Sequence, residues 1–119
     1  MTMTMPAPSR TQAFAALARA NEIRLANANF IRRLRALPSD EGRELVARLL
    51  EDPDLELEHG AAIHALSLGR LIGSIRSIGP SKTGSLLWRA GVATRDRKVR
   101  ALTNRERNAV ALELRTGRR

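Results

Sequence analysis

The chain has 119 residues, a mass of 13.1 kDa, no cysteine and a formal net charge of +9 at pH 7. This length predicts one domain with at most an appended arm, and the lack of cysteine excludes disulfides and thiolate metal sites. Aromatic residues make up only 3% of the chain, so the core must consist of Leu, Ile, Val and Ala, which predicts an all-α fold. No apolar run approaches the length of a membrane span.

The charges are separated along the chain. Residues 10–35 carry a net charge of +5, residues 40–58 carry −6, and residues 76–119 carry +9. A protein that binds a polyanion must keep its carboxylates away from the phosphates, and this distribution meets that need. The charge pattern therefore favours a nucleic-acid partner over an anionic membrane.

The first predicted element is a long basic helix. Residues 1–10, with two prolines and a repeated Met-Thr, predict a disordered tail, and residues 11–37 predict the helix, which Leu37-Pro38 ends. Its apolar residues recur at mostly helical spacing: Phe14, Leu17, Leu25, Ala28, Ile31 and Leu34. Four arginines crowd its C-terminal half, where the helix dipole favours positive charge: Arg24, Arg32, Arg33 and Arg35.

Residues 38–116 predict a compact helical domain. Its first helix begins at Ser39, has acids in the first turn and ends at Asp52-Pro53. For residues 54–68 an extended link and a short helix near residues 61–66 both remain open, and a further helix follows at about residues 69–76.

The second half of this domain contains a turn, two more helices and a basic link. The turn at Ile78-Gly79-Pro80 precedes a helix that Ser81 or a neighbour caps and that Gly91 ends. An irregular link spans residues 94–102, and a capping box of Thr103 and Glu106 opens the last helix. Apolar surface is expected from these residues of the two helices: Leu86, Leu87, Trp88, Val110, Leu112 and Leu114.

The turn before residue 81 is the leading candidate for a phosphate site. The first N–H groups of a helix lack partners inside it and lie at the positive end of its dipole, so they favour an anion. The expected contacts come from Gly79, Ser81, Lys82 and Thr83. The motif resembles a nucleotide-binding P-loop only superficially, because the Gly-Lys-Ser/Thr ending and a preceding strand are missing. An ordinary Gly-Pro turn between two helices is the plain alternative.

The basic link supplies the second group of candidate DNA contacts. Its alternating bases could reach across a phosphate backbone or into a minor groove: Arg95, Arg97, Lys98 and Arg100. A solvated polar loop is the alternative reading. The arginines of the first helix form a weaker second candidate face, since a charged helical face is usually only a hydrated one.

Other kinds of site find no support in the sequence. His59 and His64 are five residues apart, which does not place them on one helical face, and no cysteine completes a metal site. No serine lies in a nucleophile-elbow context and no pair of carboxylates has a partner suited to acid–base catalysis. We therefore expect no enzyme activity, no metal and no cofactor.

Taken together, the elements resemble the actinobacterial integration host factor family of nucleoid-associated proteins. The matching residues are Arg24 to Arg35, Leu71 to Ile75, Ser77 to Lys82, Arg95, Arg97 to Leu102, and Asn104 to Leu114. The resemblance covers about 90 residues, and its most specific part follows Leu71. Two departures are Pro80, where family members often have a basic residue, and the acidic segment 52–65.

The resemblance implies a fold and a function. The fold would be a long N-terminal helix followed by a helix-two-turns-helix domain. The protein would bind duplex DNA with little sequence preference, bend or compact it, and assist a site-specific recombinase. By this resemblance Gly79, Ser81 and Lys82 would hold phosphate, with Arg97, Lys98 and Arg100 completing the contact. We expect a monomer in the cytoplasm, associated with the nucleoid and of chromosomal or phage origin.

Two other functions remain open. The same phosphate-binding loop could serve an RNA-binding or ribosome-binding module, because it does not by itself distinguish the two duplex forms. The acidic residues 40–58 could instead form a protein-docking surface.

Overall fold

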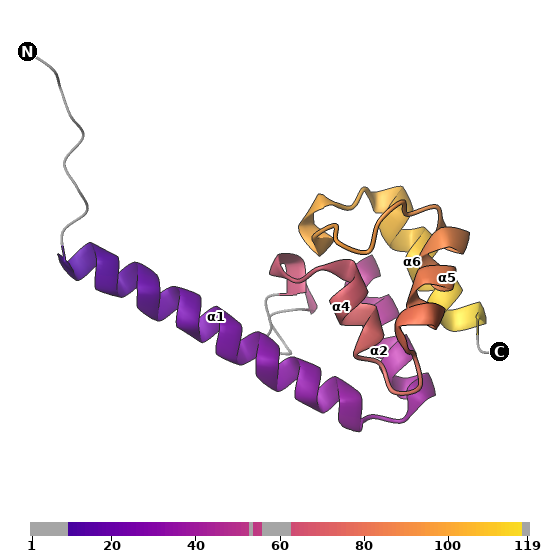
Figure 1. Ribbon diagram of the computed structural model, residues 1–119, viewed down its shortest axis with the longest axis horizontal. Helices are drawn as coiled ribbons and strands as arrows, with labels where there is room; N and C mark the ends of the chain where they lie inside the picture. Colours follow the sequence, from indigo (N-terminus) through magenta and orange to yellow (C-terminus); the bar gives the residue numbers. More distant parts are fainter. Residues whose placement is uncertain (1–9, 53, 56–62, 118–119) are drawn as a thin grey trace, which may run out of the picture.

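Helices form nearly all the regular structure in this computed structural model, which describes residues 10–52, 54–55 and 63–117. The α-helices are α1 (Arg10–Ala36), α2 (Ser39–Glu51), α4 (Leu68–Gly73), α5 (Pro80–Ala90) and α6 (Asn104–Thr116) (Figure 1). Short 3-10 turns lie at η1 (Ile63–Ala65) and η2 (Val99–Ala101). The predicted all-α fold with a long first helix is confirmed. The tail at residues 1–9 and His59 lie outside the described residues, and Arg10 belongs to α1.

α1 is divided into a buried end and a projecting end. Its buried residues are Asn27, Phe30, Ile31 and Leu34, all in the C-terminal part of the helix. Leu34 packs beside α2, because its Cδ1 lies 3.5 Å from the position that a Cβ on Gly42 would occupy. The N-terminal half extends away from the other helices (Figure 1).

The predicted apolar stripe of this helix is only partly a core element. Phe14, Leu17 and Leu25 are 68%, 54% and 64% exposed, whereas Ile31 and Leu34 are buried. The helical spacing of the first three residues correctly indicated the helix, but these residues do not join the core. The reason is geometric, since the projecting half of α1 has no neighbouring helix among the described elements (Figure 1).

The remaining helices surround the core. α2 packs mainly against α6, α5 also lies against α6, and α4 lies against α5. The core side chains come from every α-helix and from the connections, and the largest of them are Phe30, Leu34, Leu49, Leu50, Ile63, Leu68, Leu71, Ile72, Ile75 and Leu114. Two residues expected to contribute apolar surface do not join them, because Trp88 is 81% and Leu112 is 59% exposed.

Local signals place the helix ends. α2 begins at Ser39, and Gly91 ends α5 with a left-handed φ of 80°, a conformation that favours glycine. The capping box is present: Thr103 Oγ1 accepts from the Glu106 N–H at 3.1 Å, and Glu106 Oε1 accepts from the Thr103 N–H at 3.0 Å. The cap of α5 differs from the prediction, because Gly79 takes that position and Pro80 is the first helical residue.

Two arginines join α2 to α6, one of them buried and the other partly exposed. The buried Arg43 donates from Nη1 to the carbonyl oxygens of Leu114 at 3.3 Å and Gly117 at 3.2 Å. Arg115 donates to both carboxylate oxygens of Glu44, at 3.0 and 3.2 Å, and also pairs with Glu51. The hydrogen bond to Glu44 is the main cause of a raised pKa at Arg115. Two of the acidic side chains of α2, Glu44 and Glu51, are therefore paired with an arginine of the same protein.

Candidate nucleic-acid interface

The turn before α5 leaves its first amide groups open to a ligand. Gly79 has extended backbone angles, and no side chain caps the helix. A Cβ on Gly79 would meet no atom within 4 Å, so the space beside this backbone is open. Because Pro80 has no N–H, the available amides are those of the residues after it. This geometry can accept an anion at the positive end of the helix dipole.

The side chains expected at this turn have different environments. Lys82 is exposed, and its Nζ donates to the Ser77 carbonyl oxygen at 3.3 Å. Thr83 is buried, and its hydroxyl donates to the Gly79 carbonyl oxygen at 3.0 Å. Lys82 is therefore accessible to a phosphate, while the Thr83 hydroxyl instead closes the first turn of α5. Ser81 is exposed on the same turn.

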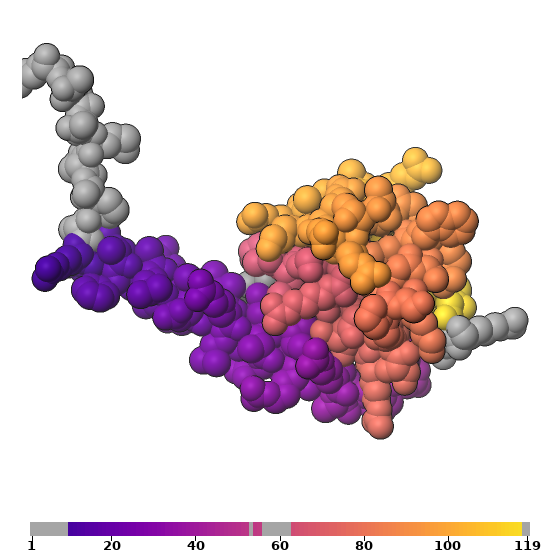
Figure 2. All heavy atoms as spheres, viewed as in Figure 1, coloured from indigo at the N-terminus to yellow at the C-terminus, as the bar shows by residue number. Residues whose placement is uncertain are grey.

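The basic link is irregular, as predicted, with a turn, a bend and the 3-10 turn η2, but hydrogen bonds hold it to the start of α4. The amide N–H groups of Leu68 and Gly69 donate to the carbonyl oxygens of Arg97 and Arg95 at 2.8 and 2.9 Å, respectively. An antiparallel bridge joins Ser67 to Lys98. The link is thus held along the start of α4, and Figure 2 shows it in orange on the surface above that helix.

Arg95 connects the link to α5. Its Nη2 donates to the Pro80 carbonyl oxygen at 3.0 Å and lies 3.2 Å from the position of a Cβ on Gly84. Its own Cβ would be only 2.6 Å from a Cβ on Gly69. Glycines at these two positions therefore let Arg95 lie between α4 and α5. This places one exposed guanidinium at a carbonyl oxygen of the first turn of α5.

Arg97 has a different role. Its Nη1 forms an ion pair with Glu106, and its Nη2 donates to the Ala101 carbonyl oxygen at 2.7 Å. Arg107 donates to the Val99 carbonyl oxygen at 3.2 Å and secures the same part of the link. Arg97 thus shapes the link and has its charge balanced, although the sequence placed it among the phosphate contacts.

The last two bases of the link are accessible. Lys98 is exposed and donates from Nζ to the Ala65 carbonyl oxygen at 3.1 Å. Arg100 is exposed on η2 and forms no side-chain hydrogen bond or ion pair within the described part of the chain. We call Lys82, Arg95, Lys98 and Arg100 the basic band. Asp96 is the exposed acid between them.

Glu106 is a second carboxylate near the basic band, after Asp96, and its charge is bound within the capping box. The hydrogen bond from the Thr103 amide is the main cause that lowers the pKa of Glu106, and the hydrogen bond and charge of Arg97 add to it. Because the carboxylate of Glu106 accepts from these groups, its charge is directed into the link and away from solvent.

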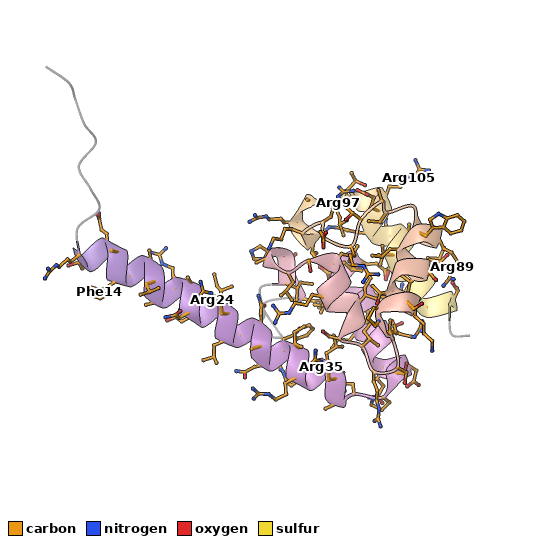
Figure 3. The ribbon with its side chains drawn as sticks, in the orientation of Figure 1. Phe14, Arg24, Arg35, Arg89, Arg97 and Arg105 are labelled. Atoms are coloured by element: carbon orange, nitrogen blue, oxygen red, sulfur yellow. The ribbon has the colours of Figure 1, made fainter. Side chains whose placement is uncertain are left out.

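The arginines of α1 form a separate cluster. Arg24, Arg32, Arg33 and Arg35 are all exposed, and the Arg33 guanidinium lies 5.9 Å from the centre of the Phe30 ring. In Figure 3, Arg35 lies at the lower edge of the molecule and Arg97 at the upper edge.

Trp88 and Arg89 were not identified as site residues from the sequence. Trp88 is 81% exposed on α5, whose buried residues are Thr83, Leu86 and Leu87. These positions have helical spacing, and on a helical wheel Trp88 falls outside the face that they define. The spacing of Thr83, Leu86 and Leu87 was therefore the signal that could have predicted an exposed Trp88. It was overlooked because tryptophan generally prefers the core.

Comparison with known proteins adds no family. The chain matches no protein-family model, no curated protein and no solved structure. Among the helices that the structure describes, none has the length and apolar character of a membrane span. Over the same residues, no three His, Asp or Glu side chains gather as metal ligands would. The case for a function depends on the charges and geometry of the chain itself.

Proposed function

We propose that the protein is a non-enzymatic, architectural DNA-binding protein that holds duplex DNA through its phosphates with little sequence preference. The observation that carries the proposal is the basic band beside the uncapped first turn of α5. Exposed Lys and Arg side chains together with open helix amides are the usual phosphate contacts of DNA-binding proteins. These groups contact phosphates and not base edges, so binding does not depend on a particular base sequence.

The charge balance supports the same proposal. Residues 76–119 hold twelve bases against three acids, and two of these acids, Glu106 and Glu113, are paired with arginines. The exposed cations of the basic band are therefore only weakly opposed. Binding of this kind is driven by release of counterions from DNA, which makes the affinity depend strongly on salt.

Two basic regions on one molecule fit an architectural role. The basic band lies on α5 and the link, and the other basic region lies on α1. One duplex wrapped from one region to the other would be bent, and two duplexes that each contact one region would be bridged. Bending, compaction, assistance to a recombinase and a location in the nucleoid remain part of the proposal through the resemblance to the integration host factor family.

The first test measures the salt dependence of DNA binding. Fluorescence anisotropy of a labelled random duplex should give an affinity that falls about tenfold or more between 50 and 200 mM salt, because several phosphates are engaged. Competition with an RNA duplex of the same length tests the alternative RNA-binding function. Stronger competition by RNA would favour that alternative, and affinity that ignores salt would contradict phosphate binding of either kind.

The second test locates the binding face. The double variant Lys82→Glu with Arg100→Glu should lose at least tenfold in affinity, since it reverses two charges of the basic band. Arg48→Glu, at an exposed position of α2, is the control for a charge reversal elsewhere. Circular dichroism should show the same helix content in all the proteins. Equal losses from the double variant and from the control would reject the assigned face.

A further inference from the structure

Trp88 is an exposed aromatic residue that the fold does not use. It is the single tryptophan of the chain and is 81% exposed, while the neighbouring Leu87 is 2% exposed. A large apolar ring normally gains most of its stabilising effect from burial. The indole is thus available to a ligand.

The surface beside the indole is hollowed. A shallow depression of about 530 Å³ runs from the first turn of α5 to the indole, and its lining is Pro80, Ser81, Gly84, Ser85, Trp88, Arg89 and Arg95. A second depression, of about 370 Å³, lies on the other side, where Gly91 and Ala93 contribute. The indole is therefore a ridge between two open hollows, and the small residues around it leave room for a flat ring.

Two guanidinium groups flank the first of these hollows. Arg89 is held by Glu113 through a hydrogen bond of 3.0 Å, and Arg95 is held by the Pro80 carbonyl oxygen. The charge of Arg89 is balanced by Glu113, whereas Arg95 meets only a neutral carbonyl, so an exposed indole beside Arg95 favours a partner that combines a flat ring with a negative charge. A nucleobase with its phosphate has both properties, because bases stack on aromatic side chains and guanidinium binds phosphate.

We propose that Trp88 stacks on an unpaired nucleobase of the bound DNA, while Arg95 holds the adjoining phosphate. This inference rests on the proposed DNA-binding function and adds a preference for DNA with a locally unpaired base. Trp88 lies eight residues after Pro80, about 12 Å along the helix axis, so one DNA segment can contact both the first turn and the indole.

A continuous duplex offers no base to this site. Its bases are stacked on each other, and removing one from the stack costs a few kcal/mol. A single unpaired base has little of that cost. The phosphates remain equivalent in both kinds of DNA, so the basic band should not distinguish them.

The fluorescence of Trp88 gives the direct test. No other tryptophan and no tyrosine contributes to the emission. The full chain is titrated with a continuous duplex and with the same duplex carrying one extra adenine. Stacking should quench the emission and protect it from acrylamide only with the second DNA.

Variants give the energetic test. Trp88→Ala should weaken binding to the duplex with the extra adenine about 5- to 150-fold, the range for loss of one stacked base. Binding to the continuous duplex should change less than twofold. Trp88→Phe should retain most of the preference, since the ring is kept. Leu112→Ala, at another exposed apolar position, is the control and should change neither affinity.

The outcomes separate the two proposals. If the wild-type protein binds neither DNA, the proposed function itself fails. If it binds both equally and Trp88→Ala has no effect, only the stacking site is overturned. In the absence of DNA, the Trp88 emission could instead change with protein concentration while sedimentation shows a dimer. That result would assign the indole to contact with a second copy of the chain and would also overturn the stacking site.

Discussion

Arg95 and Arg97 stand two residues apart in the link and have opposite roles. Arg95 lies on the surface beside α5, whereas the Arg97 guanidinium is taken up by Glu106 and Ala101. The sequence predicted both as phosphate contacts because their spacing and charge are alike. Which of them meets an internal carboxylate depends on how α6 lies against the link, and no local pattern encodes that position.

Glu106 should make the stability of the protein sensitive to acid. Its pKa is lowered in the folded protein, mainly by the Thr103 amide, from an ordinary value of 4.5. Its contribution is therefore complete above about pH 4.5 and is lost as the pH falls through the lower, folded value. Glu106→Gln keeps a side chain that can form a capping box and removes the charge. We expect the variant to be less stable than wild type by about 0.5–1 kcal/mol at pH 7.

The same difference should shrink as the pH is lowered. Urea unfolding at pH 7 and at pH 3 measures it, and the difference should be smaller at pH 3, because the contribution of the Glu106 charge declines once the pH is below its ordinary pKa of 4.5. Glu22→Gln, on the exposed half of α1, is the control and should follow wild type at both values. A difference that stays constant with pH would show that the charge of Glu106 does not contribute.

At the scale of elements, the closest approach is between α4 and the link. A Cβ on Gly69 would lie 2.6 Å from the Arg95 Cβ and 3.0 Å from its carbonyl oxygen, distances at which atoms must move. A glycine is thus required where the link crosses the start of α4. The pairing of the link with residues 67–69 depends on it.

Gly69→Ala should therefore destabilise the fold. Forcing apart the link and α4 costs about 1–3 kcal/mol, and the better helix propensity of alanine returns at most about 1 kcal/mol. The free energy of unfolding, measured in urea, should fall by about 1–2 kcal/mol. Gly73→Ala is the matched control in the same helix, since its Cβ would meet only the Thr83 hydroxyl at 3.6 Å. Equal stability of the two variants would contradict the required close approach.

Sequence signals predicted the helices better than the connections. Pro38 and Ser39, Gly91 and the capping box at Thr103 act within a few residues of each other, so local chemistry was enough to place those boundaries. The link was correctly predicted to be irregular, but its hydrogen bonds to the start of α4 were not predicted, because those partners lie some 30 residues away in the chain. The same holds for the candidate site. The residues around Lys82 were enough to predict it as a candidate, whereas the pairing of Arg97 with Glu106 depends on how distant elements pack.

At the scale of the whole molecule, α1 makes the protein elongated. The radius of gyration is 17.1 Å, whereas a compact domain of this length would have about 13.5 Å. The principal extents of 64, 30 and 25 Å agree with one long arm and one compact body (Figure 1). Burial in this arm begins only at Asn27.

A chain that lacks residues 1–21 should therefore keep its folded body. The free energy of unfolding in urea should stay within about 0.5 kcal/mol of that of the full chain, as for surface changes in general. The loss of Arg10 and Arg19 should weaken DNA binding and reduce its dependence on salt, if the arm meets phosphates. A chain lacking residues 1–29 is the contrasting control, because it also removes Asn27. Similar unfolding of the two truncated chains would contradict the division of α1.

The projecting half of α1 also changes how this protein would melt. Its helical state rests on its own hydrogen bonds and its alanines, without the tertiary contacts that stabilise most protein helices. Heating should therefore fray the arm gradually, from its free end, before the body unfolds in one cooperative step. The far-ultraviolet signal would decline over a broad sloping range and then drop sharply, while hydrogen exchange of amides in the buried helices of the body would report only the second event.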